Sequence, residues 1–320
     1  MVNAFRKEGV AASTNKALLR KELNADEAYL GIVNRVLKEG EWKENRTGMR
    51  ALAIVGATFE HDMENGFPML TTKKMGLQSV AAELEFFIKG ITDKKWLQDR
   101  KCTIWDEWAN PKKSPYGHDD ESKARMRAER DLGPIYGWQW RHFGATYENY
   151  DTDYTGKGFD QLAVAIETLK KAPNDRRQVV SAWNPTQLGQ MALPPCHLGF
   201  HITIIDNRLN LTWNQRSVDT MLGLPYNIAS YALLLHLLTK EIGKEVEGLK
   251  EGKLVGFLSD VHIYENHMEG VMEQISRNPR KYPVPKIRTD EFGSIFEWKY
   301  TDTKKEAYES YPKINFPIAV

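Results

Sequence analysis

The chain has 320 residues, of which 41% are hydrophobic, and its formal net charge is +1. This length can bury a full core as one large domain or two small ones, and the balanced charge gives no support for a nucleic-acid or membrane surface. No apolar run approaches the roughly 20 residues of a membrane span, and the first residues lack the apolar core of a signal peptide. Two cysteines make no disulfide framework, so we expect a protein of the reducing cytoplasm.

The first part of the chain predicts a polar extension, a helix and a strand. Residues 1–24 form the expected N-terminal extension, and a single catalytic domain is expected over 25–320. Asp26–Glu39 repeats apolar side chains at helical spacing and is followed by Gly40 at the C-cap position. A turn carrying Arg46 then leads into a strand-like run, ALAIVGATFEH. Alone, this arginine is only a weak signal for a phosphate site.

A second helix is predicted over Gly76–Lys89, with two glutamates among its apolar residues. Glu83 and Glu85 point about 200° apart around a helix, so they cannot be equally buried. The tryptophans Trp105 and Trp108 follow, and such a pair either belongs to the core or stacks on a flat ligand.

The middle of the chain contains a charged stretch and a short helix. Residues 111–130 are dense in charges of both signs, which predicts a surface insertion rather than a nucleic-acid arm. Aromatic residues then gather around Tyr136, and Gln161–Lys171 has the pattern of a short amphipathic helix. Arg176 and Arg177 come immediately before a predicted strand and could bind an anion only from a turn.

Residues 193–231 hold the residues with the clearest chemistry. Cys196 follows two prolines, which exclude a helix there. Arg216 stands beside Ser217, a guanidinium next to a hydroxyl, as in phosphate sites. Asn227 follows with an amide that can read the edge of a base. A thiol, an anion clamp and an amide in one stretch predict a nucleotide-modifying site.

The C-terminal third predicts a buried helix followed by a strand. Ile228–Ile242 is apolar on nearly all sides, which is typical of a buried central helix. His262 and Tyr264 lie two residues apart on the next predicted strand and so face the same side. His267 could join them at a metal ion, but no carboxylate or cysteine has ligand spacing, so we expect no metal.

These residues occur within long words that resemble the thymidylate synthase family. The words, in order, are NRTG, FPMLTTKK, IWDEWA, DLGPIYGWQWRHFG, DRRQVVSAWNP, MALPPCH, NQRSVDTMLGLPYNIASYALL, DVHIYENH and PIAV. The resemblance runs from about Tyr29 to Val320 and implies an α+β homodimer. In it, a large mixed sheet forms the subunit interface, surrounded by helices that include a long buried central one. It also implies dUMP-type substrates and 5,10-methylenetetrahydrofolate as the one-carbon donor.

The resemblance further implies roles for individual residues. The Cys196 thiolate would add to C6 of the pyrimidine and so activate C5. Arg216 would bind the phosphate and lower the pKa of the thiol. Catalytic roles are implied for Cys196, Glu83, Tyr136, His197 and Asp219. Substrate contacts are implied for Arg46, Gln215, Arg216, Ser217, Asn227, His262 and Tyr264, and, from the partner subunit, for Arg176 and Arg177. Folate contacts are implied for Lys73, Trp105, Trp108, Leu193, Asp219, Leu222, Gly223 and Val320.

Departures from the synthase pattern bear on the product. The chain resembles the phage deoxycytidylate hydroxymethylases at Arg50, Glu85, Trp138 and Asn214, whereas Asn227 is the uracil reader of synthases. Hydride and water compete for the same exocyclic methylene group in such reactions. We therefore predict water attack that yields 5-hydroxymethyl-dUMP, with Glu85, Trp138 and Asn214 setting the outcome. The alternatives are a thymidylate synthase making dTMP and dihydrofolate, and a non-catalytic family member that binds nucleotide or RNA.

Overall fold

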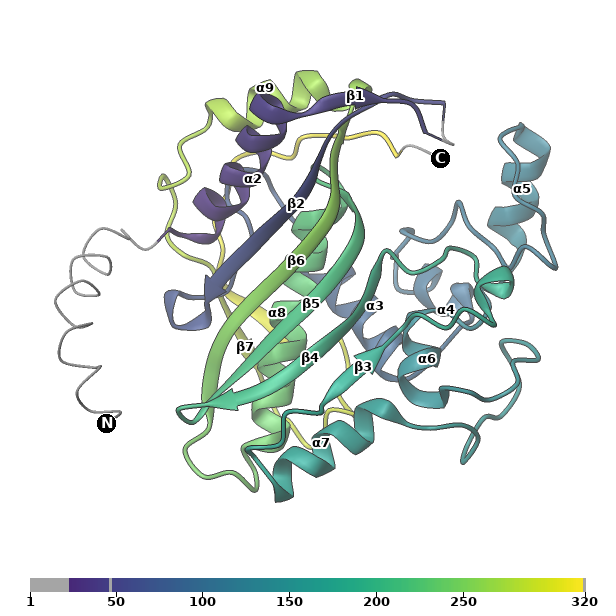
Figure 1. The fold of residues 1–320 in the computed structure, drawn as a ribbon, viewed down its shortest axis with the longest axis vertical. Helices are drawn as coiled ribbons and strands as arrows, with labels where there is room; N and C mark the ends of the chain where they lie inside the picture. The colour runs from purple at the N-terminus through teal and green to yellow at the C-terminus, as the bar shows by residue number, and fades with distance from the viewer. Residues whose placement is uncertain (1–22, 46–47, 319–320) are drawn as a thin grey trace, which may run out of the picture.

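A computed structural model describes residues 23–45 and 48–318. The fold is α+β, with one six-stranded sheet standing against a layer of helices (Figure 1). The strand order is β1-β2-β6-β5-β4-β3, in which β5 and β6 run parallel and the other neighbours antiparallel. A mixed sheet was expected, and it is confirmed.

The elements have the following bounds. The six strands of the sheet are β1 (Glu41–Lys43), β2 (Ala51–Asp62), β3 (Val179–Ser181), β4 (His197–Ile205), β5 (Arg208–Asp219) and β6 (Lys250–Tyr264), and a separate hairpin pairs β7 (Lys286–Thr289) with β8 (Thr303–Ala307). The α-helices are α2 (Ala25–Glu39), α3 (Leu77–Ile88), α4 (Lys94–Gln98), α5 (Asp120–Ala128), α6 (Tyr136–His142), α7 (Gln161–Lys171), α8 (Gly223–Ile242) and α9 (Met268–Ser276).

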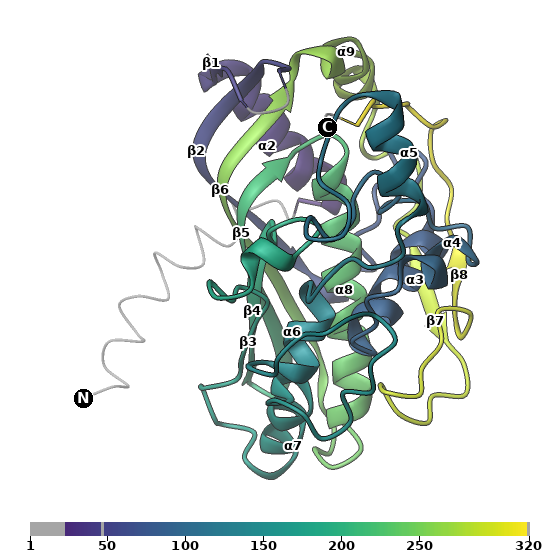
Figure 2. The same ribbon diagram turned by 90° about the vertical axis from the view of Figure 1, so that its right-hand side faces the viewer.

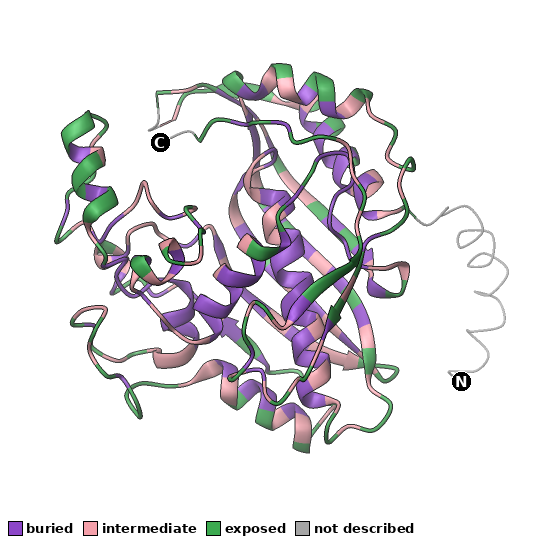
Figure 3. Ribbon diagram, turned by 180° about the vertical axis from the view of Figure 1, so that it is seen from behind, coloured by how far each residue is buried: buried purple, intermediate pink, exposed green. Residues whose placement is uncertain are grey.

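The central helix α8 connects the two parallel strands β5 and β6 and lies behind the sheet in Figure 1. Its side chains from Leu233 to Leu238 are buried apart from His236, which is half-buried. Figure 3 shows this helix surrounded by other buried segments. The expected buried helix is confirmed, and it begins five residues earlier than its apolar run because Gly223–Asn227 forms its first turn.

The opposite face of the sheet has no helix over it in Figures 1 and 2. Apolar side chains on this side are exposed, with 93% of Val55 and 48% of Phe257 accessible. The described helices therefore leave a large part of one sheet face open. No described helix is long and apolar enough to cross a membrane.

Most predicted elements appear close to their predicted bounds. The helix at Ala25–Glu39 begins after Asn24, whose side chain and that of Glu27 form a capping box. Residues 161–171 form α7 as predicted. The stretch 111–130 contains α5, whose residues are exposed except for buried Ser122 and Met126 and half-buried Lys123. Strand β1 was not predicted, because three polar or aromatic residues give no periodic signal.

Candidate active site

Cys196 lies at the start of β4, half-buried, and the side chain of Arg216 holds the loop in front of it. Arg216 Nε donates to the carbonyl of Pro195 at 2.9 Å, and Nη2 donates to that of Pro194 at 2.8 Å. The backbone N–H of Arg216 also donates to the carbonyl of Cys196 at 2.8 Å. The predicted nucleophile and the predicted anion clamp are therefore neighbours in space, although twenty residues separate them.

Tyr136 holds Cys196 from the other side. Its hydroxyl accepts a hydrogen bond from the Cys196 N–H at 2.8 Å. Tyr136 has a φ of 25°, a conformation that L-residues rarely adopt and that persists only where neighbouring structure enforces it. Here its ring stacks on Phe87 at 5.0 Å, and burial raises its pKa well above the ordinary value. The hydroxyl therefore stays protonated at neutral pH.

His197 lies against the ring of Tyr136, with the ring centres 4.3 Å apart. Its Nδ1 is 2.7 Å from the hydroxyl of Tyr231. Burial lowers the pKa of His197 to about 3. The imidazole is thus neutral at physiological pH and can relay a proton but does not carry a lasting charge.

Glu83 is connected to this group through Trp105. The indole Nε1–H of Trp105 donates to Glu83 Oε1 at 2.8 Å, and the Trp105 ring lies 5.9 Å from that of Tyr136. Burial raises the pKa of Glu83 to about 7, and the hydrogen bond from Trp105 opposes part of this rise. A carboxyl that titrates near neutral pH can both donate and accept a proton.

The predicted base reader, Asn227, is half-buried in the first turn of α8 and contacts β5. Gln215 Nε2 donates to Asn227 Oδ1 at 3.1 Å and to the backbone carbonyl of Ser217 at 3.1 Å. Gln215 is the residue next to Arg216. Strand β5 therefore holds the Gln215 amide and the Arg216 guanidinium at adjacent positions.

His262 and Tyr264 face the same side of β6, as predicted, with ring centres 5.1 Å apart. His262 Nδ1 lies 3.1 Å from a carboxylate oxygen of Asp260, which also pairs with Lys43. A carboxylate oxygen can only accept, so Nδ1 is the donor in this contact.

The residues expected to contact folate are partly brought together. Trp105 and Trp108 meet edge to face at 6.1 Å. The Trp108 Nε1–H is buried without an acceptor among the described residues, so a bound ligand could supply one. Asp219 accepts hydrogen bonds from the backbone N–H groups of Met221 and Leu222. The Leu193 side chain is half-buried, and Gly223 leaves room for a Cβ atom beside Asp219 and Asn227.

Lys73 does not fit its expected role beside the folate glutamate. It is buried, its Nζ donates to the carbonyl of Met221, and the ammonium lies 4.7 Å from the centre of the Phe316 ring. Burial lowers its pKa to about 7, an effect that nearby Asp219 opposes. In this arrangement Lys73 is a structural link to the C-terminal segment.

The three residues expected to set the reaction outcome make contacts of other kinds. Glu85 accepts from the backbone N–H of Tyr300 at 2.8 Å and pairs with Lys89. Trp138 packs in a separate small cluster of aromatic residues. Asn214 is exposed, on the face of β5 opposite to Gln215. Their expected role at the reacting carbon stays a prediction.

Four further predicted residues are either exposed or outside the described part of the chain. Arg176 and Arg177 are exposed on the turn before β3, and Arg177 pairs with Asp175 of its own chain. Arg46 and Val320 lie outside the described residues.

Two residues near the site were not predicted from the sequence. Tyr231 follows Asn227 by four positions on α8, and Asp260 precedes His262 by two on β6. These spacings put each on the same face as its neighbour, which is a usable signal.

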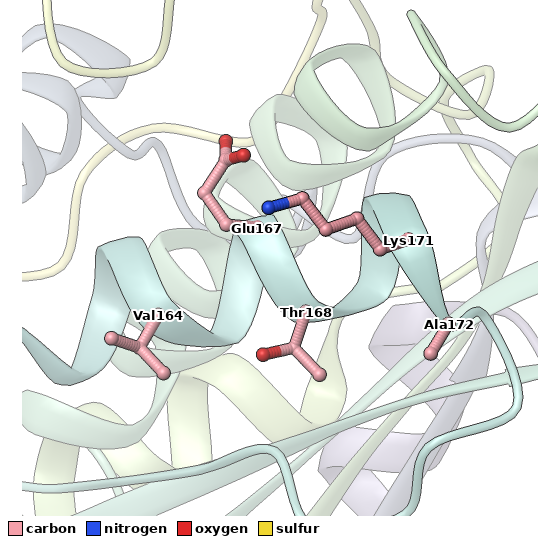
Figure 4. Close-up of a pocket in the computed structure, with 5 residues that line it drawn as sticks. All are labelled: Val164, Glu167, Thr168, Lys171 and Ala172. Atoms are coloured by element: carbon pink, nitrogen blue, oxygen red, sulfur yellow. The ribbon is translucent and has the colours of Figure 1, made fainter.

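A shallow hollow along α7 is lined by Val164, Glu167, Thr168, Lys171 and Ala172 (Figure 4). None of the predicted site residues lines it, so it does not bear on the chemistry.

Known proteins are similar to this chain in sequence. A model of the family described as thymidylate synthase matches residues 27–320. A bifunctional dihydrofolate reductase-thymidylate synthase of Paramecium tetraurelia is 40% identical over 299 residues, which is 93% of this chain and 62% of that protein. The chain thus spans about three-fifths of the length of that relative. Since the family match extends over nearly the whole described fold, the chain belongs to the thymidylate synthase family.

Proposed function

We propose that this chain makes thymidylate from dUMP, with 5,10-methylenetetrahydrofolate as donor of both the carbon and the hydride. The observation that carries the proposal is the pair of anchors on Cys196, from Tyr136 and from Arg216, beside the Gln215–Asn227 pair. Membership of the family, and the name of the relative from Paramecium tetraurelia, agree with it.

In the proposed reaction the Cys196 thiolate forms a bond to C6 of uracil, and the displaced electron pair makes C5 a carbon nucleophile. Asn227 would hold the base, since its amide can accept from N3–H and donate to O4. Glu83, with a pKa of about 7, would move protons at O4 and C5. Loss of the C5 proton and release of Cys196 then restore the aromatic pyrimidine.

The bound folate supplies the methylene carbon and then a hydride, leaving as dihydrofolate. Around it, we assign Trp105 and Trp108 to stacking, and the unpartnered Trp108 N–H to an acceptor on the ligand. Asp219 and Gly223 would line the same side of the folate. Gly223 leaves space there because it has no side chain.

Methylation is proposed over hydroxymethylation because the matching family model and the relative from Paramecium tetraurelia both carry thymidylate synthase in their descriptions. The case for water attack came from the resemblance to hydroxymethylases at Arg50, Glu85, Trp138 and Asn214. The contacts of the last three add no support to it, since Glu85 accepts from the N–H of Tyr300, Trp138 packs in a separate aromatic cluster and Asn214 is exposed.

We further propose that two copies pair through the open face of the sheet. Exposed Val55 and Phe257 on that side would be buried by a second copy. Arg176 and Arg177 would then serve the phosphate site of the partner, which explains why they lie apart from Arg216 in their own chain.

The decisive experiment incubates the protein with dUMP and methylenetetrahydrofolate. Near-ultraviolet absorbance reports oxidation of the folate, and mass spectrometry identifies the nucleotide. We expect the absorbance to rise and the product to be dTMP, with no turnover by the Cys196→Ser control. A product with one extra oxygen and no folate oxidation would instead identify a hydroxymethylase. Absence of both turnover and a covalent adduct would identify a binding protein.

A further inference from the structure

A buried indole lies directly behind the base-reading pair. Trp213 is fully buried on β5, two residues before Gln215, so both side chains project from the same face of the strand. The Trp213 Nε1–H donates to Gln215 Oε1 at 3.1 Å. The other end of the Gln215 amide donates to Asn227. Trp213, Gln215 and Asn227 therefore form one chain of hydrogen bonds.

The chemistry of the indole fixes which atom donates and which accepts along this chain of hydrogen bonds. An indole nitrogen can only donate, so the oxygen of Gln215 must face Trp213 and its NH₂ must face Asn227. Asn227 is consequently held with its oxygen toward Gln215 and its own NH₂ turned the other way. The Ser217 carbonyl, which can only accept, supports the same orientation, because Gln215 Nε2 also donates to it at 3.1 Å. Without the Trp213 N–H, that carbonyl alone would oppose rotation of the Gln215 amide by half a turn.

Packing on several sides keeps the indole in place. It stacks on Tyr231 with ring centres 5.2 Å apart and an angle of 14° between planes. Tyr231 lies one helical turn after Asn227, so α8 contributes both the stacking ring and the amide. On β6 the residue paired with Trp213 is Gly256, where a Cβ atom would overlap the indole ring. Gly256 therefore makes room for a tryptophan at this position.

We propose that Trp213 is a positioning residue for base selection, acting through Gln215 on the amide of Asn227. This inference rests on the proposed function, in which Asn227 reads uracil. Uracil presents a donor at N3 and an acceptor at position 4, whereas cytosine presents an acceptor at N3 and a donor at position 4. An Asn227 amide of fixed orientation matches one of these two orders, and a rotated amide matches the other. The Trp213 N–H, together with the Ser217 carbonyl, removes the second possibility.

The test uses Trp213→Phe, which removes the N–H and keeps an aromatic ring on Tyr231. The measured quantity is the ratio of the dissociation constants of dCMP and dUMP, obtained by calorimetry. We expect the preference for dUMP to fall by a factor of about three to ten, because one of the two restraints on the Gln215 amide is lost while the Ser217 carbonyl remains. The matched control is Trp298→Phe, which loses a buried N–H bonded at 3.1 Å to Thr303 in the region of the β7–β8 hairpin. The control should keep the wild-type ratio.

A second pair of variants separates the relay from simple packing. In a Gln215→Leu background, Trp213→Phe should change the ratio no further, because the link to Asn227 is already broken. Should Trp213→Phe prove unstable, benzothienylalanine at position 213 keeps the shape of the indole without the N–H and is expected to lower the ratio equally. An unchanged ratio in the folded variants, or the same loss in both backgrounds, would overturn the proposal. Failure of the wild-type protein to turn over dUMP would instead refute the proposed function, since it is measured separately.

Discussion

At the scale of a residue, two glutamates on one helix show that the position of a side chain decides its role. Glu83 faces Trp105 and the group around Cys196, and burial raises its pKa to about 7. Glu85, two residues on, accepts from the Tyr300 N–H and pairs with Lys89. The same side chain is therefore a candidate proton carrier in one place and a structural anchor in the other.

The raised pKa of Glu83 predicts a pH-dependent cost to stability. The ordinary pKa of 4.5 rises to about 7 on folding, so the folded protein binds this proton more tightly than the unfolded chain. The contribution of Glu83 to stability therefore falls as pH rises through this interval and stays low above it. Relative to wild type, Glu83→Gln should gain about 2–3 kcal/mol of unfolding free energy between about pH 5 and about pH 8.

Urea unfolding at the two pH values measures this difference. Glu269→Gln, at an exposed position on α9, is the control for the change in charge. An equal difference between Glu83→Gln and wild type at both pH values would show that Glu83 ionises at its ordinary pKa.

At the scale of an element, the charged stretch at residues 111–130, predicted to be an insertion, is held more firmly than its composition suggests. Lys94 is almost fully buried, and its Nζ donates to the carbonyl of Trp108 at 2.8 Å and to that of Met126 in α5. Burial lowers the pKa of Lys94 to about 8. Lys113 adds an ion pair with the buried carboxylate of Asp131. One ammonium group thus connects the charged helix to the tryptophan pair near the site.

Lys94→Met should loosen the insertion, because two buried carbonyls lose their donor at a cost of about 1–3 kcal/mol each. We expect limited proteolysis within residues 111–130 to become several-fold faster while the rest of the chain stays resistant. Lys95→Met, at the neighbouring position where the lysine pairs with Asp99 on the surface, is the control. Equal cleavage rates for both variants would mean that Lys94 does not hold the insertion.

At the scale of the whole molecule, we propose that each site uses residues from two copies of the chain. Cys196, Arg216 and Asn227 converge at one end of β4, β5 and α8, whereas Arg177 is exposed and, among the described residues, pairs with the neighbouring Asp175. On this proposal, a second copy on the open face of the sheet would supply its arginines to the site.

Mixing two inactive variants tests this arrangement. Cys196→Ser lacks the nucleophile and Arg177→Ala lacks the shared cation, so each alone should be inactive or nearly so. If the subunits exchange freely, half of the dimers are mixed and each contains one intact site, so about a quarter of wild-type activity should return. Mass-tagged subunits verify the exchange. No recovered activity after verified exchange would place Arg177 outside the partner's site.

Periodicity and local chemistry determined much of this protein from the sequence alone. Ala25–Glu39 and Gln161–Lys171 follow from helical spacing and capping residues, and the long motifs around Cys196 and Asn227 indicate the family. Such patterns involve residues that are close together in the sequence, so they can be recognised without knowledge of the fold. They also show which side chains share a face, as with His262 and Tyr264.

Only the tertiary structure decided what each face meets. Residue type and resemblance name Glu85, Trp138 and Asn214 as candidates, but only the fold shows that Glu85 meets Tyr300, that Trp138 packs in a separate aromatic cluster and that Asn214 is exposed. The link from Trp213 through Gln215 to Asn227 likewise depends on α8 packing over β5. Contacts between distant segments depend on how the helices pack on the sheet. No local pattern in the sequence specifies which side chains that packing brings together.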